Sequence, residues 1–279
     1  MTGYLLVVIT IISIGICYYA AKKRSHLFEI HELAACPRVV RELVTGFIEE
    51  TTAMFRPYSP KAPLLVNAMR SVNTQQIIDL CSGNGGPWFH LASEIEREIE
   101  LPVSVVLTDK FPSSEAQQRI ELMNGITYIG DSIDARHVPE ALQGVRTLFN
   151  GFHHFQREDA KAVLQGAVAN GHPIAVFEIA QRNILTLIQA FLLPLSVLLL
   201  TPFVRPFEWW RMVLTYVIPI ASLVLLWDGV VSVLRCYRPS ELEEMVEELD
   251  GMPYRWEIGS YLHLTVPVTY MIGYPSKVE

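Results

Sequence analysis

The chain has 279 residues, of which 51% are hydrophobic and 18% are charged, and its 22 Lys and Arg residues stand against 29 Asp and Glu residues. A chain of this length and apolar content buries a substantial core, which excludes disordered and collagen-like proteins. The formal net charge of −7 disfavours a nucleic-acid partner, because such partners select basic surfaces. The 4 cysteines are far apart without C-x-x-C spacing, so the sequence predicts neither a metal site nor a disulfide framework.

An uncharged, mainly apolar run occupies residues 4–21. Its length is close to that of a membrane-spanning helix, and a basic triplet follows it at residues 22–24. A cleavable signal peptide would carry positive charge before its apolar core, and the first three residues supply none. We therefore expect residues 1–24 to be a membrane anchor, with the catalytic domain facing the cytoplasm according to the positive-inside tendency.

Short apolar runs alternate with helix-length segments through residues 25–182 and 235–279. Parallel strands are predicted at residues 76–80, 102–108, 126–129, 145–149 and 173–177. Helices are predicted at residues 39–55, 88–98, 114–123, 157–169 and 239–249. Two closing strands are predicted at residues 254–264 and 268–274. This alternation is typical of a single α/β domain.

Two long apolar blocks interrupt this domain at residues 183–204 and 213–234. The first block is uncharged, and the second carries only Asp228. The segment between them contains Trp209 and Trp210, which suit the headgroup zone of a membrane. The blocks therefore predict a membrane hairpin inserted into the α/β domain.

Alternatives for residues 183–234 stay open. The prolines Pro194, Pro202 and Pro219 permit a bent, shallow insertion, and a helical hairpin in a soluble core is the competing interpretation. Asp228 is either a functional carboxylate inside the membrane segment or a residue at its interface.

Residues 77–86 carry the most informative pattern, a strand that ends in Asp79 and runs into a glycine turn with Gly83 and Gly85. Such a turn lets backbone pass close to a nucleotide-like group, which suits either a dinucleotide or S-adenosylmethionine. The dinucleotide fingerprint G-x-G-x-x-G requires a small residue where this chain has Trp88, so the sequence disfavours a nicotinamide cofactor.

The same run resembles motif I of the class I S-adenosylmethionine-dependent methyltransferases, with Cys81 in place of the first glycine. The resemblance extends to Asp109, where the family places the acid for the ribose hydroxyls, and to Asp131 or Ser132, which would meet the adenine amino group. It covers residues 39–182 and 235–274, and implies a Rossmann-like seven-stranded sheet whose seventh strand is antiparallel. The cofactor-binding residues that it implies are Asp79, Cys81, Ser82, Gly83, Gly85, Asp109, Lys110, Asp131, Ser132 and Asn150.

The resemblance also suggests residues around the methyl group. His153 and His154 follow the fourth strand, and either is a candidate general base because the pKa of an ordinary imidazole lies near 6.5. Glu178 ends the fifth strand and is a candidate for orienting the substrate. Arg56 and Tyr58 precede the first strand at about the distance of the family's cofactor-covering segment, although a linker without a role explains them equally well.

The resemblance, together with the apolar segments, implies a membrane-anchored enzyme that transfers a methyl group to a small lipophilic acceptor by SN2 displacement. Two alternatives remain. One is a membrane-tethered protein that binds the cofactor without turnover, and the other is a nucleotide-dependent oxidoreductase.

Overall fold

The computed structural model describes residues 23–276 apart from residue 34 and residues 205–206. The predicted anchor at residues 1–24 thus lies almost entirely outside the described residues. The chain divides into two compact units. We call them the helical unit, Met1–Phe47 with Ala180–Tyr237, and the sheet unit, Ile48–Ile179 with Arg238–Glu279.

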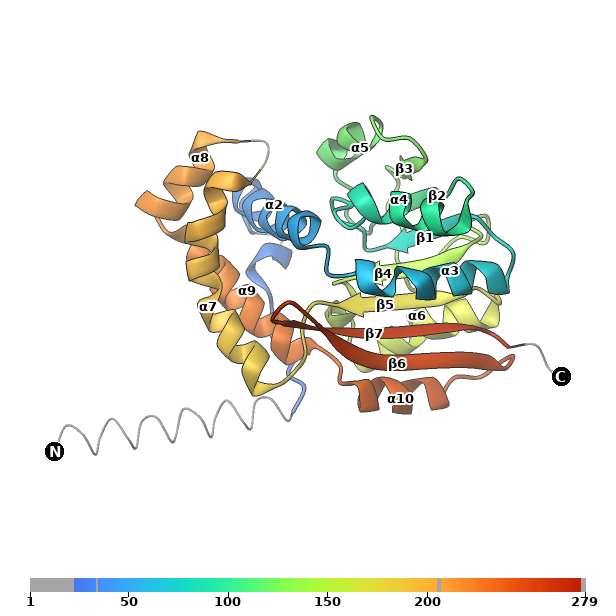
Figure 1. The fold of residues 1–279 in the computed structure, drawn as a ribbon. Helices are drawn as coiled ribbons and strands as arrows, with labels where there is room; N and C mark the ends of the chain where they lie inside the picture. The colour runs from blue at the N-terminus through green and yellow to red at the C-terminus, as the bar shows by residue number, and fades with distance from the viewer. Residues whose placement is uncertain (1–22, 34, 205–206, 277–279) are drawn as a thin grey trace. The chain divides into compact units, whose positions relative to one another are not determined.

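The sheet unit contains a seven-stranded sheet in the order β3-β2-β1-β4-β5-β7-β6 (Figure 1). The first five strands pair in parallel, whereas β7 runs antiparallel to β5 and β6 antiparallel to β7. Every residue of β4 and β5 is buried, as expected for central parallel strands covered on both faces. The strands are β1 (Gln76–Leu80), β2 (Ser104–Thr108), β3 (Ile126–Tyr128), β4 (Val145–Phe149), β5 (Ile174–Glu178), β6 (Tyr254–His263) and β7 (Val266–Pro275).

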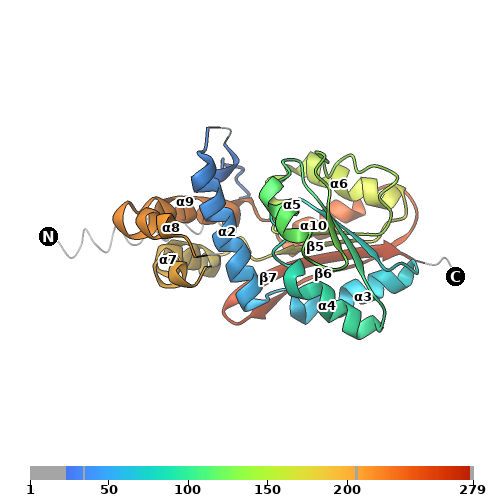
Figure 2. The ribbon, with the colours of Figure 1, turned by 90° about the horizontal axis from the view of Figure 1, so that it is seen from above.

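Helices cover both faces of this sheet. Seen from above, α3 and α4 lie on one side and α6 lies on the other (Figure 2). The helices are α3 (Ala62–Ser71), α4 (Trp88–Ile99), α5 (Ser114–Ile120), α6 (Arg157–Ala169) and α10 (Pro239–Glu247), with short 3-10 turns η2 (Ser59–Lys61) and η3 (Phe152–His154).

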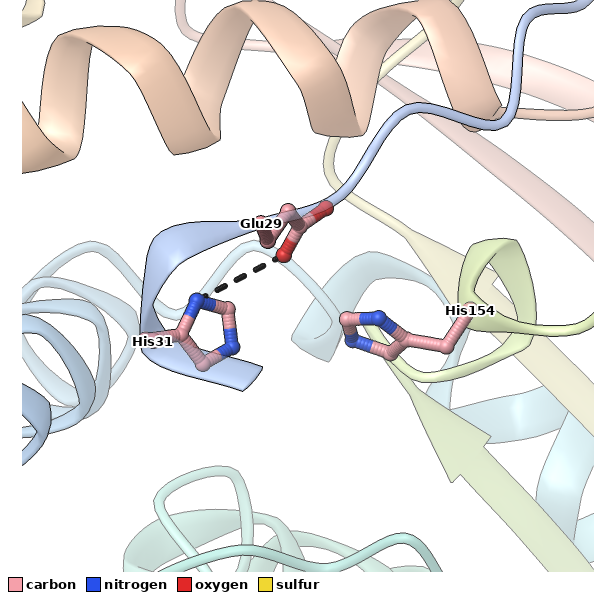
Figure 3. A group of neighbouring side chains, drawn as sticks. All are labelled: Glu29, His31 and His154. Carbon is pink, nitrogen blue, oxygen red and sulfur yellow. Dashed lines mark ion pairs between the residues drawn. The ribbon is translucent and has the colours of Figure 1, made fainter. Parts of the chain in front are cut away.

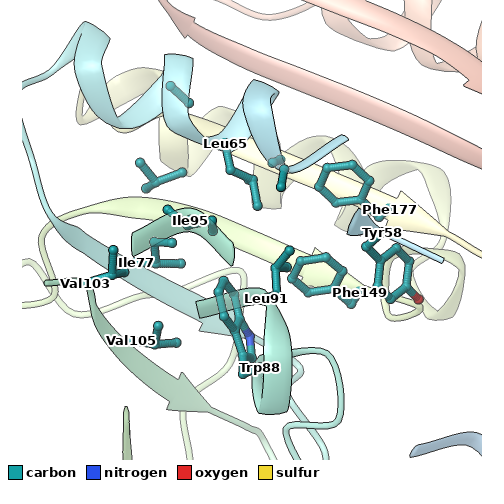
Figure 4. Packing of buried hydrophobic residues seen from close by; sticks show 14 of the residues in the cluster. Tyr58, Leu65, Ile77, Trp88, Leu91, Ile95, Val103, Val105, Phe149 and Phe177 are labelled. Carbon is teal, nitrogen blue, oxygen red and sulfur yellow. The ribbon is translucent and has the colours of Figure 1, made fainter. Parts of the chain in front are cut away.

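The core between the sheet and the helices α3 and α4 is rich in aromatic rings near the ends of β4 and β5 (Figure 4). Phe149 and Phe177 stack with ring centroids 5.3 Å apart, and Trp88 meets Phe149 edge-on at 5.5 Å. Such pairs add to the stabilisation by burial and hold these strand ends in one geometry.

The strands predicted from the sequence are confirmed, each to within two residues at either end, and so is the antiparallel seventh strand. The helix predicted at 114–123 ends earlier, at Ile120. The chain turns there, with Met123 N donating to Ile120 O and Gly125 in a left-handed conformation (φ 77°).

The helical unit contains the helices that interrupt the α/β domain together with part of α2 (Arg38–Phe55), whose last residues belong to the sheet unit. Its two long inserted helices, α7 and α9, pack along each other (Figure 1). Besides α2, the elements are η1 (Ile30–Glu32), α7 (Ile184–Leu200), η4 (Thr201–Phe203), α8 (Trp209–Met212), the π-helical turn η5 (Val213–Val217) and α9 (Ile220–Arg235).

In the described residues, one helical segment, Ile184–Phe203, is long and apolar enough to cross a membrane, with a mean hydropathy of 2.3. A second segment qualifies only if Trp209–Val217 and Ile220–Arg235 count together, and these are bent by 77° at their junction. The predicted helical hairpin is therefore present, while its insertion into a membrane stays a prediction.

Candidate functional site

The candidate site lies at the carboxyl ends of the parallel strands in the sheet unit. Strand order reverses between β1 and β4, which are neighbours in the sheet although two strands separate them along the chain. In open α/β sheets such a switch point opens a crevice in which ligands bind. The predicted site residues follow the ends of β1, β2, β3, β4 and β5 and so gather along this edge.

The turn after β1 has an unusual backbone. Gly83 and Gly85 adopt positive φ angles of 52° and 78°, and Cys81 does so too at 55°. A Cβ atom on Gly85 would lie 2.7 Å from the Leu107 side chain, so this position requires glycine. Cys81 therefore occupies a left-handed position that suits glycine, which costs about 1–2 kcal/mol for another residue.

The carboxyl group of Asp79 is buried within the sheet. Its Oδ1 atom accepts a 2.6 Å hydrogen bond from Thr147 Oγ1 on β4, and its main-chain oxygen accepts one from Thr108 Oγ1 on β2. Burial raises the pKa of Asp79 to about 7, although the bond from Thr147 opposes the shift. Asp79 thus ties three strand ends together beneath the glycine turn.

Asp109 is held directly against that turn. Its Oδ2 atom accepts a hydrogen bond from Gly83 N at 2.9 Å, and its Oδ1 atom accepts one from Phe111 N at 2.8 Å. A carboxylate offers about four lone-pair sites, so both oxygens can still accept bonds from a diol. The side chain is only partly buried, which leaves it accessible to a ligand.

The neighbouring predicted residues form a connected loop cluster. Ser132 Oγ donates to Lys110 O at 2.6 Å, and Lys110 Nζ lies 3.0 Å from Asp134 Oδ2. The hydrogen bonds of Asp134 with Arg136 hold the pKa of that carboxyl well below its usual range. Asp131 is exposed, and within the described part of the chain its side chain makes no hydrogen bond or ion pair.

His153 and Glu178 form the tightest side-chain pair at the site. Glu178 Oε2 lies 2.6 Å from His153 Nδ1, and Glu178 Oε1 accepts the backbone N–H groups of Phe152 and His153 at 2.7 and 3.1 Å. With Nδ1–H donating a hydrogen bond to the Glu178 carboxylate, Nε2 is the ring nitrogen that carries the free lone pair. Both side chains are buried, so the carboxylate orients the imidazole.

The structure separates the two candidate histidines by their surroundings. The His153 and His154 rings lie 4.1 Å apart. Of these two rings, that of His153 is the one hydrogen-bonded to Glu178 among the contacts that the structure describes. His154 stands at the end of η3 and is half-buried (Figure 3).

Asn150 adopts a left-handed conformation at the end of β4, with φ 51°. Its Oδ1 atom accepts a hydrogen bond from Ile179 N at 2.7 Å, and its own N–H donates to Phe177 O. In the described residues the side-chain NH₂ has no protein acceptor, which leaves it to donate to a ligand.

Tyr58 brings a hydroxyl group into the aromatic cluster beside β4 and β5. Its ring lies 4.7 Å from Phe149 and 5.9 Å from Phe177, and only 1% of the residue is exposed. Its hydroxyl oxygen is buried without a hydrogen-bond partner among the described atoms. Burial raises the pKa of Tyr58 far above its usual value, and the charge of Glu178 adds to this.

Arg56 has different surroundings. Its guanidinium is exposed and lies 3.6 Å from Glu94 on α4. The two residues of the predicted covering segment thus differ, because Tyr58 is buried beside rings of β4 and β5, whereas Arg56 is exposed and lies near Glu94 of α4.

Three further residues support the site and were not singled out from the sequence as functional. Thr147 binds Asp79, and Tyr128 donates its hydroxyl proton to Gly83 O at 3.1 Å. Glu49 on α2 is buried beside Gly86, where an added Cβ would lie 3.0 Å from Glu49 Cγ, and forms an ion pair with Arg119 at 2.8 Å. Of these three, only Thr147 gave a signal in the sequence, as a polar residue inside a buried central strand.

Comparison with solved structures gives a likeness over most of the chain. The plantazolicin methyltransferase BpumL in complex with SAH is 12% identical, with a TM-score of 0.53 over 88% of this chain and 94% of that one. The same enzyme with a monoazolic desmethylPZN analog and SAH is also 12% identical, with a TM-score of 0.51 over 85% and 90% of the two chains. The chain has the class I methyltransferase fold.

At this identity the likeness concerns the fold alone. No protein-family model matches the chain. No curated protein matches it either. The fold nevertheless agrees with the sheet order and antiparallel β7 described above, and it explains why the glycine turn, Asp109 and the ends of β4 and β5 share one edge.

Proposed function

We propose that the protein transfers a methyl group from S-adenosylmethionine to a small lipophilic acceptor, with His153 as the general base and Glu178 as its orienting carboxylate. The observation that carries this proposal is the buried 2.6 Å His153–Glu178 pair beside the glycine turn and Asp109 of a class I methyltransferase fold. The roles of all the predicted site residues are part of the proposal.

The described residues fit the proposed cofactor. Asp109 has unused acceptor positions for the two hydroxyls of a ribose, and the turn at Gly83 and Gly85 permits close approach of backbone. Asn150 offers an NH₂ group, and the orphaned hydroxyl of Tyr58 lacks a partner that a bound ligand would supply. A buried unsatisfied group costs roughly 1–3 kcal/mol, so a polar ligand atom at Tyr58 would relieve a penalty of the free protein.

When bound, S-adenosylmethionine supplies an electrophilic methyl group on its sulfonium sulfur, and that sulfur keeps the electron pair of the S–CH₃ bond when the bond breaks. The protein positions the acceptor in line with that bond, which can supply on the order of 7–11 kcal/mol. His153 removes the proton of a hydroxyl or amine acceptor at Nε2 as the new bond forms. Glu178 accepts the hydrogen bond from Nδ1–H of His153 and stabilises the imidazolium that results.

The lipophilic character of the acceptor is inferred from chain organisation. The apolar helices of the helical unit begin at Ile184, a few residues after Glu178 at the end of β5, and residues 4–21 form a further apolar run. An enzyme attached to a bilayer through these segments would meet substrates dissolved in lipid. We place the protein at a membrane, with its sheet unit facing the cytoplasm.

Calorimetric titration of the detergent-purified full chain with S-adenosylmethionine, S-adenosylhomocysteine and NADH tests the cofactor. We expect both adenosyl ligands to bind and NADH not to bind. Binding of NADH alone would replace the proposal by a nucleotide-dependent oxidoreductase.

Transfer of a labelled methyl group from S-adenosylmethionine to membrane lipid extracts then tests turnover. We expect labelled product with the wild-type chain and much less with His153→Gln. Cofactor binding without transfer to any extract would favour a tethered binding protein, which the residue at position 81 also allows, since Cys81 stands where the family has glycine.

A further inference from the structure

The helical unit has one face that is apolar and exposed along its whole length. On α7, Leu187, Ala190 and Val197 point into the unit and are buried. The opposite side of the same helix exposes large apolar side chains at helical spacing, and only 28% of the apolar segment is buried. These exposed residues are Ile184, Leu185, Ile188, Phe191, Leu192, Leu195, Leu198 and Leu199, which we call the α7 stripe.

A charged helix covers another side of the unit. Val40, Val44 and Phe47 of α2 are buried in one cluster with residues of α7 and α9. The outer side of α2 carries charge, with Arg38 Nε 2.5 Å from Glu42 Oε1. A complete crossing of the bilayer would bring this charged surface into hydrocarbon, because it runs alongside the inserted helices.

Asp228, near the middle of α9, binds polar groups of the segment that precedes α2. Asp228 accepts hydrogen bonds from Ile30 N at 2.6 Å and His31 N at 3.2 Å, and its Oδ2 lies 2.9 Å from His31 Nδ1. His31 also pairs with Glu29 (Figure 3). The segment that carries these groups is not itself apolar, and burying it in lipid would be costly.

The apolar run at residues 4–21 comes directly before the first described residues of this unit in the sequence. Arg24 donates from Nε to Arg235 O at 2.6 Å and lies over the ring of Tyr237, and Ser25 N donates to Leu234 O. The end of α9 is therefore next to the point where the sequence leaves a potential anchor. Lys23 and Arg24 give this region a positive charge that complements anionic lipid headgroups.

We propose that the α7 stripe docks into one leaflet of a lipid bilayer, and that the chain returns to the side from which it entered rather than crossing. The occupant of the stripe is lipid, and this inference rests on the membrane attachment proposed above. The 16 residues of α9 span only about 24 Å, less than the roughly 30 Å of hydrocarbon. The 77° bend before α9 further shortens its reach, and the exposed Trp209 at the start of α8 suits the headgroup zone.

Flotation and labelling of the full chain in sealed phosphatidylcholine–phosphatidylglycerol vesicles test this arrangement. Leu122→Cys marks the sheet unit, where Leu122 is 86% exposed, and Phe207→Cys marks an exposed position between η4 and α8 of the helical unit. The double variant is added to preformed vesicles and treated with a membrane-impermeant maleimide before or after detergent. Peptide mass spectrometry reads each site separately, so the native cysteines stay in place.

We expect both introduced cysteines to label from outside to the same extent without detergent. Leu195→Cys in the α7 stripe should resist the aqueous reagent in floated vesicles and react after detergent. Failure of the chain to float overturns membrane attachment together with the docking face. Floating protein in which Phe207→Cys reacts only after detergent, while Leu122→Cys reacts before it, overturns the one-leaflet arrangement alone.

A second copy of the chain is the competing occupant of the stripe. Efficient disulfide cross-linking between two Leu195→Cys chains, with quenching by brominated lipids absent from a fluorophore on that cysteine, would overturn lipid as the occupant. Quenching without cross-linking supports it.

Discussion

The Nδ1 atom of His153 lies 2.6 Å from Oε2 of Glu178, although the two residues are 25 positions apart. Glu178 ends β5, whereas His153 lies on the turn after β4, and these strands are neighbours in the sheet. The same carboxylate accepts two backbone N–H groups of that turn. The imidazole therefore has a fixed orientation before any substrate arrives.

Replacement of Glu178 by Gln tests whether this orientation matters for catalysis. The Gln side chain would present an NH₂ group to Nδ1 and favour the tautomer with its proton on Nε2, which cannot act as a base there. We expect methyl transfer to slow by about 10²–10⁴-fold in single-turnover assays, the range for a general base. The affinity for S-adenosylhomocysteine should stay nearly unchanged. His154→Ala is the matched control, and an equal loss in that variant would contradict the assignment of His153.

Asp109→Ala should weaken the binding of S-adenosylhomocysteine. Loss of hydrogen bonds to a charged acceptor costs about 1.5–3 kcal/mol, which is roughly a 10- to 150-fold rise in Kd by calorimetry. Glu140→Ala removes an exposed acid that has no described side-chain partner and serves as the control. Unchanged affinity in Asp109→Ala would count against the entire cofactor site.

Tyr58→Phe should affect the free and bound proteins in opposite ways. Removing a buried hydroxyl without a partner relieves an unsatisfied group, so the Tm of the free protein should stay constant or rise. If a ligand atom satisfies that hydroxyl, cofactor affinity should fall by several-fold. An unchanged affinity would show that the hydroxyl does not meet the ligand.

Cys81→Gly should stabilise the protein by about 1 kcal/mol, because glycine adopts the left-handed conformation at this position without strain. Cys81→Ala keeps the strain and should not raise the Tm, which makes it the matched control. Equal Tm values for the two variants would show that the left-handed backbone is not a source of strain.

The contribution of Asp79 to the stability of the free protein should fall as pH rises from about 4 to about 7. Burial raises the pKa of Asp79 to about 7, whereas an Asp in an unfolded chain loses its proton near pH 3.9. Between these values the folded state holds a proton that the unfolded state has released, so the free energy of unfolding decreases with pH. Burial shifts the pKa of Glu49 in the same direction, also to about 7.

Asp79→Asn should reduce this slope, and the double variant with Glu49→Gln should reduce it further. This slope is measured from Tm values determined across the pH range in detergent. A wild-type slope in both variants would show that neither carboxyl carries the proton.

The order of the strands along the chain could be predicted because it depends on local patterns. A run such as residues 174–177 is apolar throughout because its strand is buried on both faces, and Gly83 and Gly85 indicate a turn that favours glycine. The seven strand positions follow from such signals, and the family resemblance implied that the seventh strand is antiparallel. The pairing of β7 between β5 and β6 is known only from the structure.

The functional pairings could not be predicted in this way. Nothing near Tyr58 in the sequence indicates that its hydroxyl is buried without a partner among rings from β4 and β5. Glu49 is likewise one acid on an amphipathic helix until folding brings it beside Gly86. Such contacts join residues that are distant in sequence, and local propensity carries no information about them.

The sequence by itself determined the α/β alternation, the glycine turn that follows Asp79, and the apolar composition of residues 183–234, because each depends on residues within a few positions of one another. Only the tertiary structure decided that Glu178 accepts hydrogen bonds from His153, that Asp109 accepts one from Gly83 N–H, and that the α7 stripe is exposed while Val40, Val44 and Phe47 of α2 pack with α7 and α9. Each of these features depends on how segments that are distant in sequence pack and share hydrogen-bond partners, so it is fixed only in the folded chain.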